Sequence, residues 1–289
     1  MIDRLCVIGV GLMGGSVARG AKARGLVGTV VGVERDARDL ERALDLGVID
    51  SAAADVAEST AGADLVMIAT PVGAIEGVLR GLQPSWSERA VYTDVGSTKC
   101  NVIAAAERVF GTVPANFVPG HPIAGAEKSG VDAATAELYT GKRVILTPLE
   151  STRPEATAQV EALWDALGAN VSRMEPHHHD EVLAATSHLP HVLAFVLTEM
   201  LGRKDEQQEI FQYAAGGFRD FTRIASSDPQ MWLDICLANR AEIVPLIEQY
   251  RDALAVAAGL ISEGRAEAIR SLFANARGAR QRFLDQLEK

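Results

Sequence analysis

The chain has few cysteines, no long hydrophobic run and little positive charge, and each shortage excludes a class of protein. Its three cysteines lie far apart, with the spacing of neither a disulfide framework nor a metal site. No run reaches the roughly 18 apolar residues of a membrane helix, and the start lacks signal-peptide character. With 28 Lys and Arg against 38 Asp and Glu, the net charge is −10, which gives no global attraction for nucleic acid or membranes. We expect a cytoplasmic protein with reduced thiols.

The composition that remains is that of an ordinary globular protein, with 48% hydrophobic and 23% charged residues in 289, enough for about two domains. The first half alternates helical stretches with short apolar runs at residues 4–8, 29–33, 64–69, 90–93, 116–118 and 143–146. Near-continuous apolar strands separated by helices predict a parallel sheet covered on both faces.

The second half changes class. From about residue 176 we find helical periodicity and no convincing strand. An apolar stripe recurs at intervals of three and four residues near the end, which we interpret as core and dimer interface: Ile269, Leu272, Phe273, Ala276, Phe283 and Leu287. We therefore predict an α/β domain over residues 1–174 and an all-α substrate and dimerisation domain over residues 175–289.

A glycine-rich turn follows the first predicted strand and opens a helix. In Gly9-Val10-Gly11-Leu12-Met13-Gly14, the first glycine permits a tight turn, the second lets the backbone approach a pyrophosphate and the third allows close helix–strand contact. The helix N-terminus offers N–H groups to the phosphates. This context predicts a Rossmann-like dinucleotide-binding domain, with the cofactor bound by Gly9, Gly11, Leu12, Met13 and Gly14.

The residue that ends the second predicted strand indicates which cofactor is used. Glu34 lies 20 residues beyond Gly14, where a carboxylate can accept hydrogen bonds from both ribose hydroxyls and repels a 2′-phosphate. This favours NAD. Arg35 and Arg38 stand close by and leave NADP open, so Arg35 is also a candidate cofactor-binding residue.

Polar residues follow the later strands, at the sheet edge where such folds bind ligands. Thr70-Pro71 ends the third run, Ser97 follows the fourth and His121 follows the fifth. We predict that Thr70, Pro71 and Ser97 contact the cofactor. An imidazole titrates near neutrality, so His121 is suited to take a proton from a hydroxyl as hydride leaves the same carbon, with an inflection near its usual pKa of about 6.5.

Five separated segments resemble the prephenate/arogenate (cyclohexadienyl) dehydrogenase family. They occur in order over nearly the whole chain: Asp94-Val95-Gly96-Ser97-Thr98-Lys99, His121-Pro122-Ile123-Ala124-Gly125-Ala126-Glu127-Lys128-Ser129-Gly130, Ser187-His188-Leu189-Pro190-His191, Gly216-Gly217-Phe218-Arg219-Asp220-Phe221-Thr222-Arg223-Ile224-Ala225 and Asp228-Pro229-Gln230-Met231-Trp232. The resemblance implies NAD(P)-dependent oxidative decarboxylation of prephenate to 4-hydroxyphenylpyruvate, or of arogenate to tyrosine, in tyrosine biosynthesis.

The resemblance also implies roles for individual residues. His121 would act on the ring hydroxyl, Ser97 would hold His121 and the substrate, and Arg223 would bind a substrate carboxylate. His188 and His191 would line the substrate pocket, to which Glu127 and Asp220 also belong. Trp232 would approach the partner's site in a homodimer. An ion pair between Arg223 and Asp220 is an alternative that can coexist with substrate binding.

Some features depart from the family's pattern or favour other functions. Ala126 stands where many members carry Thr, and we expect neither a chorismate mutase segment nor a regulatory domain. Three adjacent histidines, His177 to His179, cannot converge on one ion from a helix, so we predict a helix start there and no metal. The alternatives are a β-hydroxyacid-type dehydrogenase, although no Lys follows Gly216-Gly217, and a non-catalytic dinucleotide-sensing protein.

Overall fold

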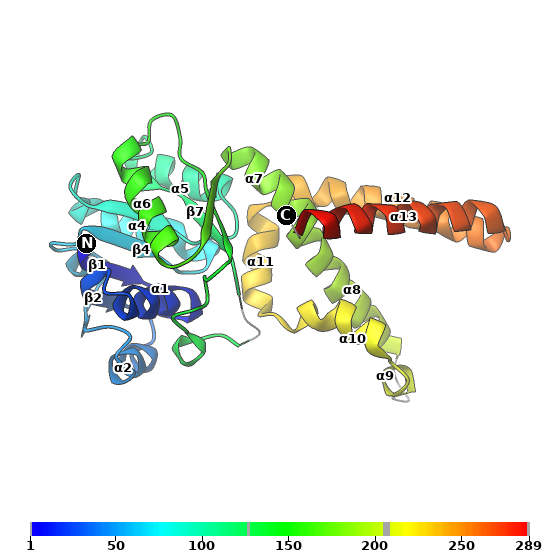
Figure 1. Ribbon diagram of the computed structural model, residues 1–289, viewed down its shortest axis with the longest axis horizontal. Coiled ribbons are helices and arrows are strands. Elements are labelled where there is room, and N and C mark those ends of the chain that lie inside the picture. The colour runs from blue at the N-terminus through cyan, green and yellow to red at the C-terminus, as the bar shows by residue number, and fades with distance from the viewer. Residues whose placement is uncertain (1, 126–127, 205–208, 288–289) are drawn as a thin grey trace. The chain divides into compact units, whose positions relative to one another are not determined.

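The computed structural model describes residues 2–125, 128–204 and 209–287. Its N-terminal part contains a six-stranded parallel sheet of order β3-β2-β1-β4-β5-β6 (Figure 1). The order reverses between β1 and β4, the point at which open parallel sheets bind ligands. The strands are β1 (Ile2–Ile8), β2 (Val27–Val33), β3 (Ser51–Ala52), β4 (Leu65–Ile68), β5 (Val91–Asp94) and β6 (Phe117–Val118).

Helices cover both faces of this sheet, as the apolar runs predict. Along β1, Leu5 and Val7 belong to one buried cluster while Cys6 and Ile8 belong to another, because successive side chains of a strand point to opposite faces. The first cluster includes side chains of α1 (Leu12–Ala23) and α6 (Pro154–Ala166), and the second those of α4 (Ile75–Leu82) and α5 (Cys100–Phe110). Two short helices, α2 (Ala37–Asp45) and α3 (Val56–Ser59), complete this part.

A second, three-stranded sheet corrects one expectation. The run at 143–146 does form a strand, β8 (Arg143–Leu146), but it lies between β7 (Gly120–Ile123) and β9 (Asn170–Arg173) and not in the parallel sheet. The sixth strand of the large sheet is instead the two-residue β3, which is too short to give an apolar signal. Only Pro119 separates β6 from β7, and it cannot donate a ladder hydrogen bond. The chain therefore changes sheets immediately before His121.

From residue 176 onward the described residues form helices and turns, which confirms the predicted change of class. A continuous helical segment comprises α7 (Pro176–Leu183), a π-helical turn (Ala184–His188) and α8 (Leu189–Lys204). By length and composition alone this segment could cross a membrane. Within this segment, Asp180 accepts hydrogen bonds from two backbone amides of the sheet-bearing part, at Lys99 and Cys100, which ties α7 to that part. Shorter helices follow: α9 (Glu209–Gln212), α10 (Gly216–Thr222) and α11 (Pro229–Ala238).

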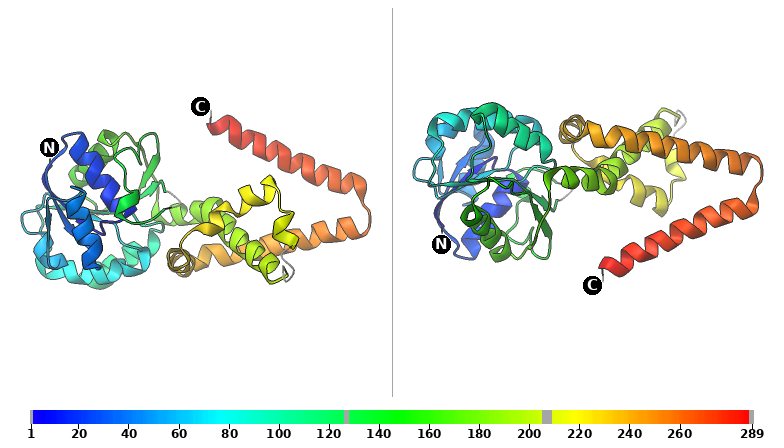
Figure 2. Two further views of the ribbon diagram at one scale, coloured as in Figure 1. Left: turned by 90° about the horizontal axis from the view of Figure 1, so that it is seen from below. Right: turned by 90° about the horizontal axis from the view of Figure 1, so that it is seen from above.

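The chain divides into two compact units, residues 1–240 and 241–289. The second unit consists of the long helices α12 (Arg240–Ser262) and α13 (Ala266–Leu287), which diverge from a short turn (Figure 2). In the predicted apolar stripe on α13, Leu272 and Phe273 are 42% and 61% exposed. These side chains are therefore not part of the chain's own core.

Candidate active site

The glycine-rich turn between β1 and α1 needs glycine at two positions. Gly9 has a φ of +97°, and a Cβ there would lie 2.6 Å from the carbonyl oxygen of Ala69 at the end of β4. A Cβ on Gly14 would lie 2.1 Å from the carbonyl oxygen of Gly9. By contrast, a Cβ on Gly11 would have no atom within 4 Å. The turn is thus tightly packed behind and open in front, at the N-terminus of α1.

The open side of this turn carries groups that a phosphate-containing ligand could use. Gly11 caps α1 without a side-chain hydrogen bond, so the first N–H groups of the helix have no capping side chain. Leu12 and Met13 form the half-buried first turn of the helix. The Thr70 hydroxyl is buried and lacks a hydrogen-bond partner within the described chain, beside the exposed Pro71. These features fit a dinucleotide.

Glu34 is already tied to the same turn. Its Oε2 accepts a hydrogen bond from the backbone N–H of Val10 at 3.0 Å, and its Oε1 accepts one from Arg35 at 2.8 Å. A carboxylate has about four acceptor positions, so two remain for a ribose. The Arg38 guanidinium pairs with Asp36 at 3.2 Å and is 90% exposed, whereas Arg35 has an exposed side chain after the strand. Glu34 is therefore an acidic group in direct contact with the turn.

A fully buried ion pair fixes the end of β5 to the start of β7. Lys99 Nζ lies 2.5 Å from Asp94 Oδ2 and donates to the carbonyl oxygen of Gly120 at 2.6 Å. Asp94 in turn accepts from the backbone N–H groups of Gly96 and Gly120. Burial lowers the pKa of Lys99, although the charge of Asp94 opposes this effect. This network holds His121, the next residue, at the edge of the sheet.

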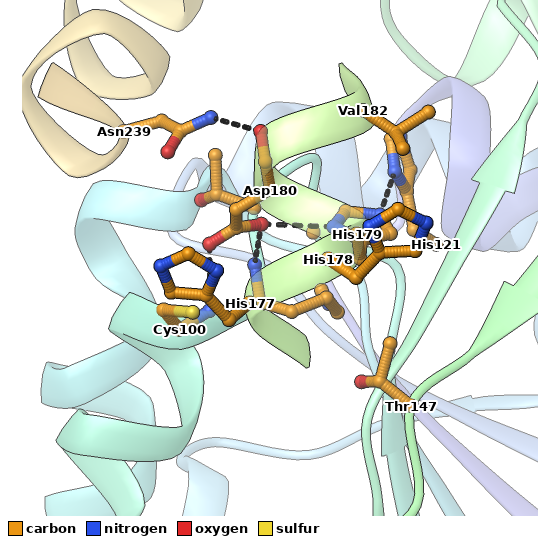
Figure 3. A network of polar contacts seen from close by, with 12 residues as sticks. Cys100, His121, Thr147, His177, His178, His179, Asp180, Val182 and Asn239 are labelled. Atoms are coloured by element: carbon orange, nitrogen blue, oxygen red, sulfur yellow. Dashed lines mark hydrogen bonds and ion pairs between the residues drawn. The ribbon is translucent and has the colours of Figure 1, made fainter. Parts of the chain in front are cut away.

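His121 belongs to a chain of three polar side chains (Figure 3). Its Nδ1 lies 2.9 Å from His179 Nε2, and His179 Nδ1 lies 2.8 Å from Asp180 Oδ1. His121 is 8% exposed, and burial, followed by the neighbouring His179 and Lys99, lowers its pKa well below the usual value. His121 is therefore a neutral imidazole at neutral pH.

A second group of aromatic side chains lies on the helical side. The imidazole of His191 stacks on the indole of Trp232 with 3.8 Å between ring centroids, and its Nδ1 faces the carbonyl oxygen of Ser187 at 2.8 Å. His188 Nδ1 lies 3.1 Å from Asn239 Nδ2. Burial lowers the pKa of His188 to about 4, so the ring is neutral, accepts from Asn239 and carries its proton on Nε2. That Nε2 is buried without a partner among the described residues.

The remaining predicted site residues differ in their exposure and in their contacts. Ser97 is half-buried after β5, and no hydrogen bond joins it to His121 among the described residues. Arg223 is exposed, but its positive charge lowers the pKa of His191 after the larger effect of burial, which places it near that ring. Asp220 is exposed and lies 3.8 Å from Arg219 Nε. Glu127 and Ala126 lie outside the described residues.

Trp232 lies on α11 and packs within its own chain. Its side chain is 8% exposed and stacks on His191 of its own chain. Its approach to a partner's site, which the resemblance implies, stays a prediction.

The sequence did not single out the residues that support His121. Asp94 and Lys99 stand there only as parts of a family segment, and His179 only as part of a histidine run at a helix start. The helix start is correct, since Glu175 accepts hydrogen bonds from the backbone N–H groups of His177 and His178. A run of three histidines and an aspartate was the available signal. Among the described residues, no group of three or more His, Cys, Asp or Glu is arranged to hold a metal ion.

The fold and the site together define a nucleotide-binding domain of the dehydrogenase type. The defining features are the parallel sheet, the open glycine-rich turn at its switch point, the carboxylate after β2 and the buried imidazole at the sheet edge. Two family models match the chain: "prephenate dehydrogenase, nucleotide-binding domain" over residues 17–173 and "prephenate dehydrogenase, dimerization domain" over residues 175–275.

Individual relatives agree with these models. A cyclohexadienyl dehydrogenase of Zymomonas mobilis is 38% identical, with 86% of this chain and 85% of the relative aligned. The solved prephenate dehydrogenase of Aquifex aeolicus, in complex with hydroxyphenyl propionate and NAD+, is 35% identical with a TM-score of 0.91, covering 98% and 99% of the two chains. A Synechocystis arogenate dehydrogenase is 29% identical with a TM-score of 0.80, covering 97% and 99%. The chain belongs to the prephenate dehydrogenase family and is an oxidoreductase.

Proposed function

We propose that this protein catalyses the NAD-dependent oxidative decarboxylation of prephenate to 4-hydroxyphenylpyruvate, of arogenate to tyrosine, or of both, in tyrosine biosynthesis. The observation that carries the proposal is His121: a neutral, buried imidazole held at the ligand-binding edge of the sheet by the Asp94–Lys99 pair. The two solved relatives that align over nearly their whole length are named a prephenate dehydrogenase and an arogenate dehydrogenase. Membership of this family favours the proposal over the β-hydroxyacid and sensing alternatives.

The glycine-rich turn is the proposed cofactor site. The N-terminus of α1 would receive the pyrophosphate, with Gly9, Gly11, Leu12, Met13 and Gly14 forming the turn. Glu34 would accept hydrogen bonds from the ribose, while Thr70, Pro71 and Ser97 would lie along the remainder. When bound, NAD accepts the hydride. Arg35 is the residue that would permit use of NADP.

His121 has the protonation state that the reaction needs. As hydride leaves the hydroxyl-bearing ring carbon, neutral His121 takes the hydroxyl proton and a carbonyl begins to form. The carbonyl withdraws electrons as carbon dioxide leaves the opposite ring carbon, and aromatisation drives the reaction. The protein therefore has to supply a base, orientation and charge complementarity.

The helical side would bind the rest of the substrate. A planar guanidinium matches a carboxylate, so Arg223 is the proposed anchor of a substrate carboxylate. The Nε2–H of His188, which has no partner among the described residues, would donate a hydrogen bond, and His191 and Trp232 would form an aromatic wall. Asp220 and Glu127 remain predicted substrate-site residues.

The assembly is proposed to be a homodimer in the cytoplasm. The dimerization-domain match and the exposed apolar side chains of α12 and α13 support association of two chains. The structure joins no two of Cys6, Cys100 and Cys236 in a disulfide, which suits a reducing compartment.

A spectrophotometric assay tests the proposal. Purified protein with NAD should form reduced nicotinamide when prephenate or arogenate is added, and the ratio of the two kcat/KM values ranks the substrates. His121→Asn should lower kcat by roughly 10²–10⁴-fold, the usual worth of a positioned base, with little change in the affinity for NAD. Glu34→Ser should weaken NAD and improve NADP. Absence of reduced nicotinamide with both substrates and both cofactors would refute the function.

A further inference from the structure

We infer that His179 and Asp180 are positioning residues for His121, because they determine which ring nitrogen of His121 is free to receive the substrate's proton. The inference rests on the proposed role of His121 as the base. It assigns a function to two residues of α7 that the described reaction does not otherwise use. The evidence is the order of donors and acceptors along the contacts between these three side chains (Figure 3).

Asp180 is an acceptor at one end of this chain of contacts. Its Oδ1 accepts from the backbone N–H of Lys99 at 2.7 Å, and its Oδ2 accepts from that of Cys100 at 2.8 Å, at the N-terminus of α5. Burial would raise the pKa of Asp180, but the hydrogen bonds from His179 and these amides outweigh it and lower the pKa. An ionised carboxylate has no proton to donate. The atom that faces it must therefore carry one.

The acceptor at Asp180 sets the tautomer of both histidines. His179 Nδ1 must donate to Asp180 Oδ1, and since burial keeps His179 neutral, its Nε2 is an acceptor. His121 Nδ1, 2.9 Å from that Nε2, must then donate. The neutral ring of His121 has a single N–H, so its Nε2 keeps a free lone pair. That nitrogen is the one available to the ring hydroxyl of the substrate.

The same contacts stabilise His121 after it reacts. The substrate O–H bond breaks, an Nε2–H bond forms on His121, and the ring becomes an imidazolium that still donates from Nδ1 to His179. A positive charge on a ring with 8% exposure is costly unless it is compensated. The carboxylate of Asp180, two contacts away, supplies that compensation through the polarised ring of His179.

Asp180 also caps α5, so its replacement would disturb folding as well as His121. Variants of His179 avoid this problem, because the carboxylate of Asp180 still accepts hydrogen bonds from the backbone amides of Lys99 and Cys100. His179→Leu removes the acceptor for His121, whereas His179→Gln offers an amide oxygen to the same N–H. His178 provides a matched control, since it is adjacent, its side chain is 60% exposed and its ring contacts Glu181.

Kinetics of these variants separate positioning from a structural role. We expect His179→Leu to lower kcat by about 10²-fold, less than the roughly 10⁴-fold that a wrong histidine tautomer costs a serine protease. The KM values for NAD and substrate should change little. His179→Gln should recover most of kcat, and His178→Gln should equal the unmodified enzyme. Equal losses in the Leu and Gln variants would overturn the inference.

Nitrogen NMR of histidine-labelled protein gives a readout that is independent of activity. In the unmodified protein at neutral pH, the resonances of His121 and His179 should both show a protonated Nδ1 and an unprotonated Nε2, with assignments made from single histidine variants. A protonated Nε2 on neutral His121 would overturn the inference even if prephenate is oxidised. If neither substrate is oxidised but both tautomers are as stated, the proposed function fails and the positioning network stands.

Discussion

At the scale of single residues, a buried and an exposed ion pair of the chain have similar N···O distances. Lys99 and Asp94 have no exposed side-chain surface, while Lys22 and Asp50 are 30% and 41% exposed at 2.6 Å. Removing one partner of a buried pair leaves the other charge buried and alone, which costs about 3–5 kcal/mol. Exposed pairs contribute about 0–1 kcal/mol.

We therefore predict that Lys99→Met lowers the free energy of unfolding by about 3–5 kcal/mol, whereas Lys22→Met changes it by less than about 1 kcal/mol. Urea unfolding of the two variants and the unmodified protein measures both changes, provided that the free energy of unfolding depends on urea concentration with the same slope in all three. Similar losses of unfolding free energy in the two variants would contradict the stronger stabilisation expected from the buried pair.

The pH dependence of the reaction should follow from the burial of His121. The sequence alone predicts an acid-side inflection near 6.5, but burial, with His179 and Lys99 nearby, lowers the pKa of His121 well below that value. The neutral form is the active base, so a lower pKa extends activity toward acid. The acid limb of kcat/KM should therefore lie below 6.5. An inflection at or above 6.5 that disappears in His121→Asn would contradict the assigned burial.

Arg223 can be tested against its neighbour. A hydrogen bond to a charged group contributes about 1.5–3 kcal/mol, so Arg223→Ala should raise the substrate KM by roughly 10- to 10²-fold while the KM for NAD stays nearly constant. Arg219→Ala removes an exposed guanidinium that lies 3.8 Å from Asp220 and serves as the control. Equal effects in both variants would indicate a general loss of positive charge, and no effect in either would remove Arg223 from the site.

At the scale of elements, two glycines of the glycine-rich turn have different roles. Gly14 allows close packing, and Gly11 faces the proposed ligand. Gly14 brings α1 against the turn, since a Cβ there would lie 2.1 Å from a backbone oxygen and 2.7 Å from Val7 Cγ1. Gly11 faces open space and has an ordinary φ of −81°. Substitution by alanine should therefore have different effects on stability and on NAD binding at the two positions.

Gly14→Ala should destabilise the protein by about 3 kcal/mol or more, because a backbone atom has to move. Gly11→Ala should lower the free energy of unfolding by only about 1 kcal/mol, since alanine is a poorer N-cap than glycine, but raise the KM for NAD, because its methyl group enters the proposed pyrophosphate site. Thermal unfolding and cofactor titration of both variants separate these effects. A stable Gly14→Ala protein would show that α1 can shift away from β1.

At the scale of the whole molecule, the unit at residues 241–289 cannot bury its own apolar surface. Val256 and Ile261 on α12 are each 63% exposed, and Phe273 on α13 is 61% exposed. Exposed apolar surface of this kind marks an interaction site. The matching family model is that of a dimerization domain. These side chains are therefore candidates for the contact between two chains.

We predict that sedimentation gives twice the 30.7 kDa mass of one chain and that Phe273→Asp shifts the equilibrium toward monomer. A dimer should also show a melting temperature that rises with protein concentration. Leu44→Asp, at a 38% exposed apolar residue on α2, is the control and should remain dimeric. A monomer at all concentrations would refute the homodimer.

The sequence by itself determined the features that depend on neighbouring residues. Turn chemistry and strand periodicity are local, so the glycine-rich turn, Glu34 after β2, most buried strands and the change to helices after residue 175 could be read directly. His121 could be read as well, because it follows a predicted strand and lies within one of the five family segments.

Only the tertiary structure decided which distant residues meet. His121 contacts His179 across 58 positions, and the amide of Lys99 contacts Asp180 across 81. The pairing of β8 with β7, and not with the large sheet, likewise depends on contacts between residues that are distant in the sequence. A histidine run on a helix predicts neither its partners nor its protonation, because both depend on the burial and the hydrogen-bonding groups that packing brings around it.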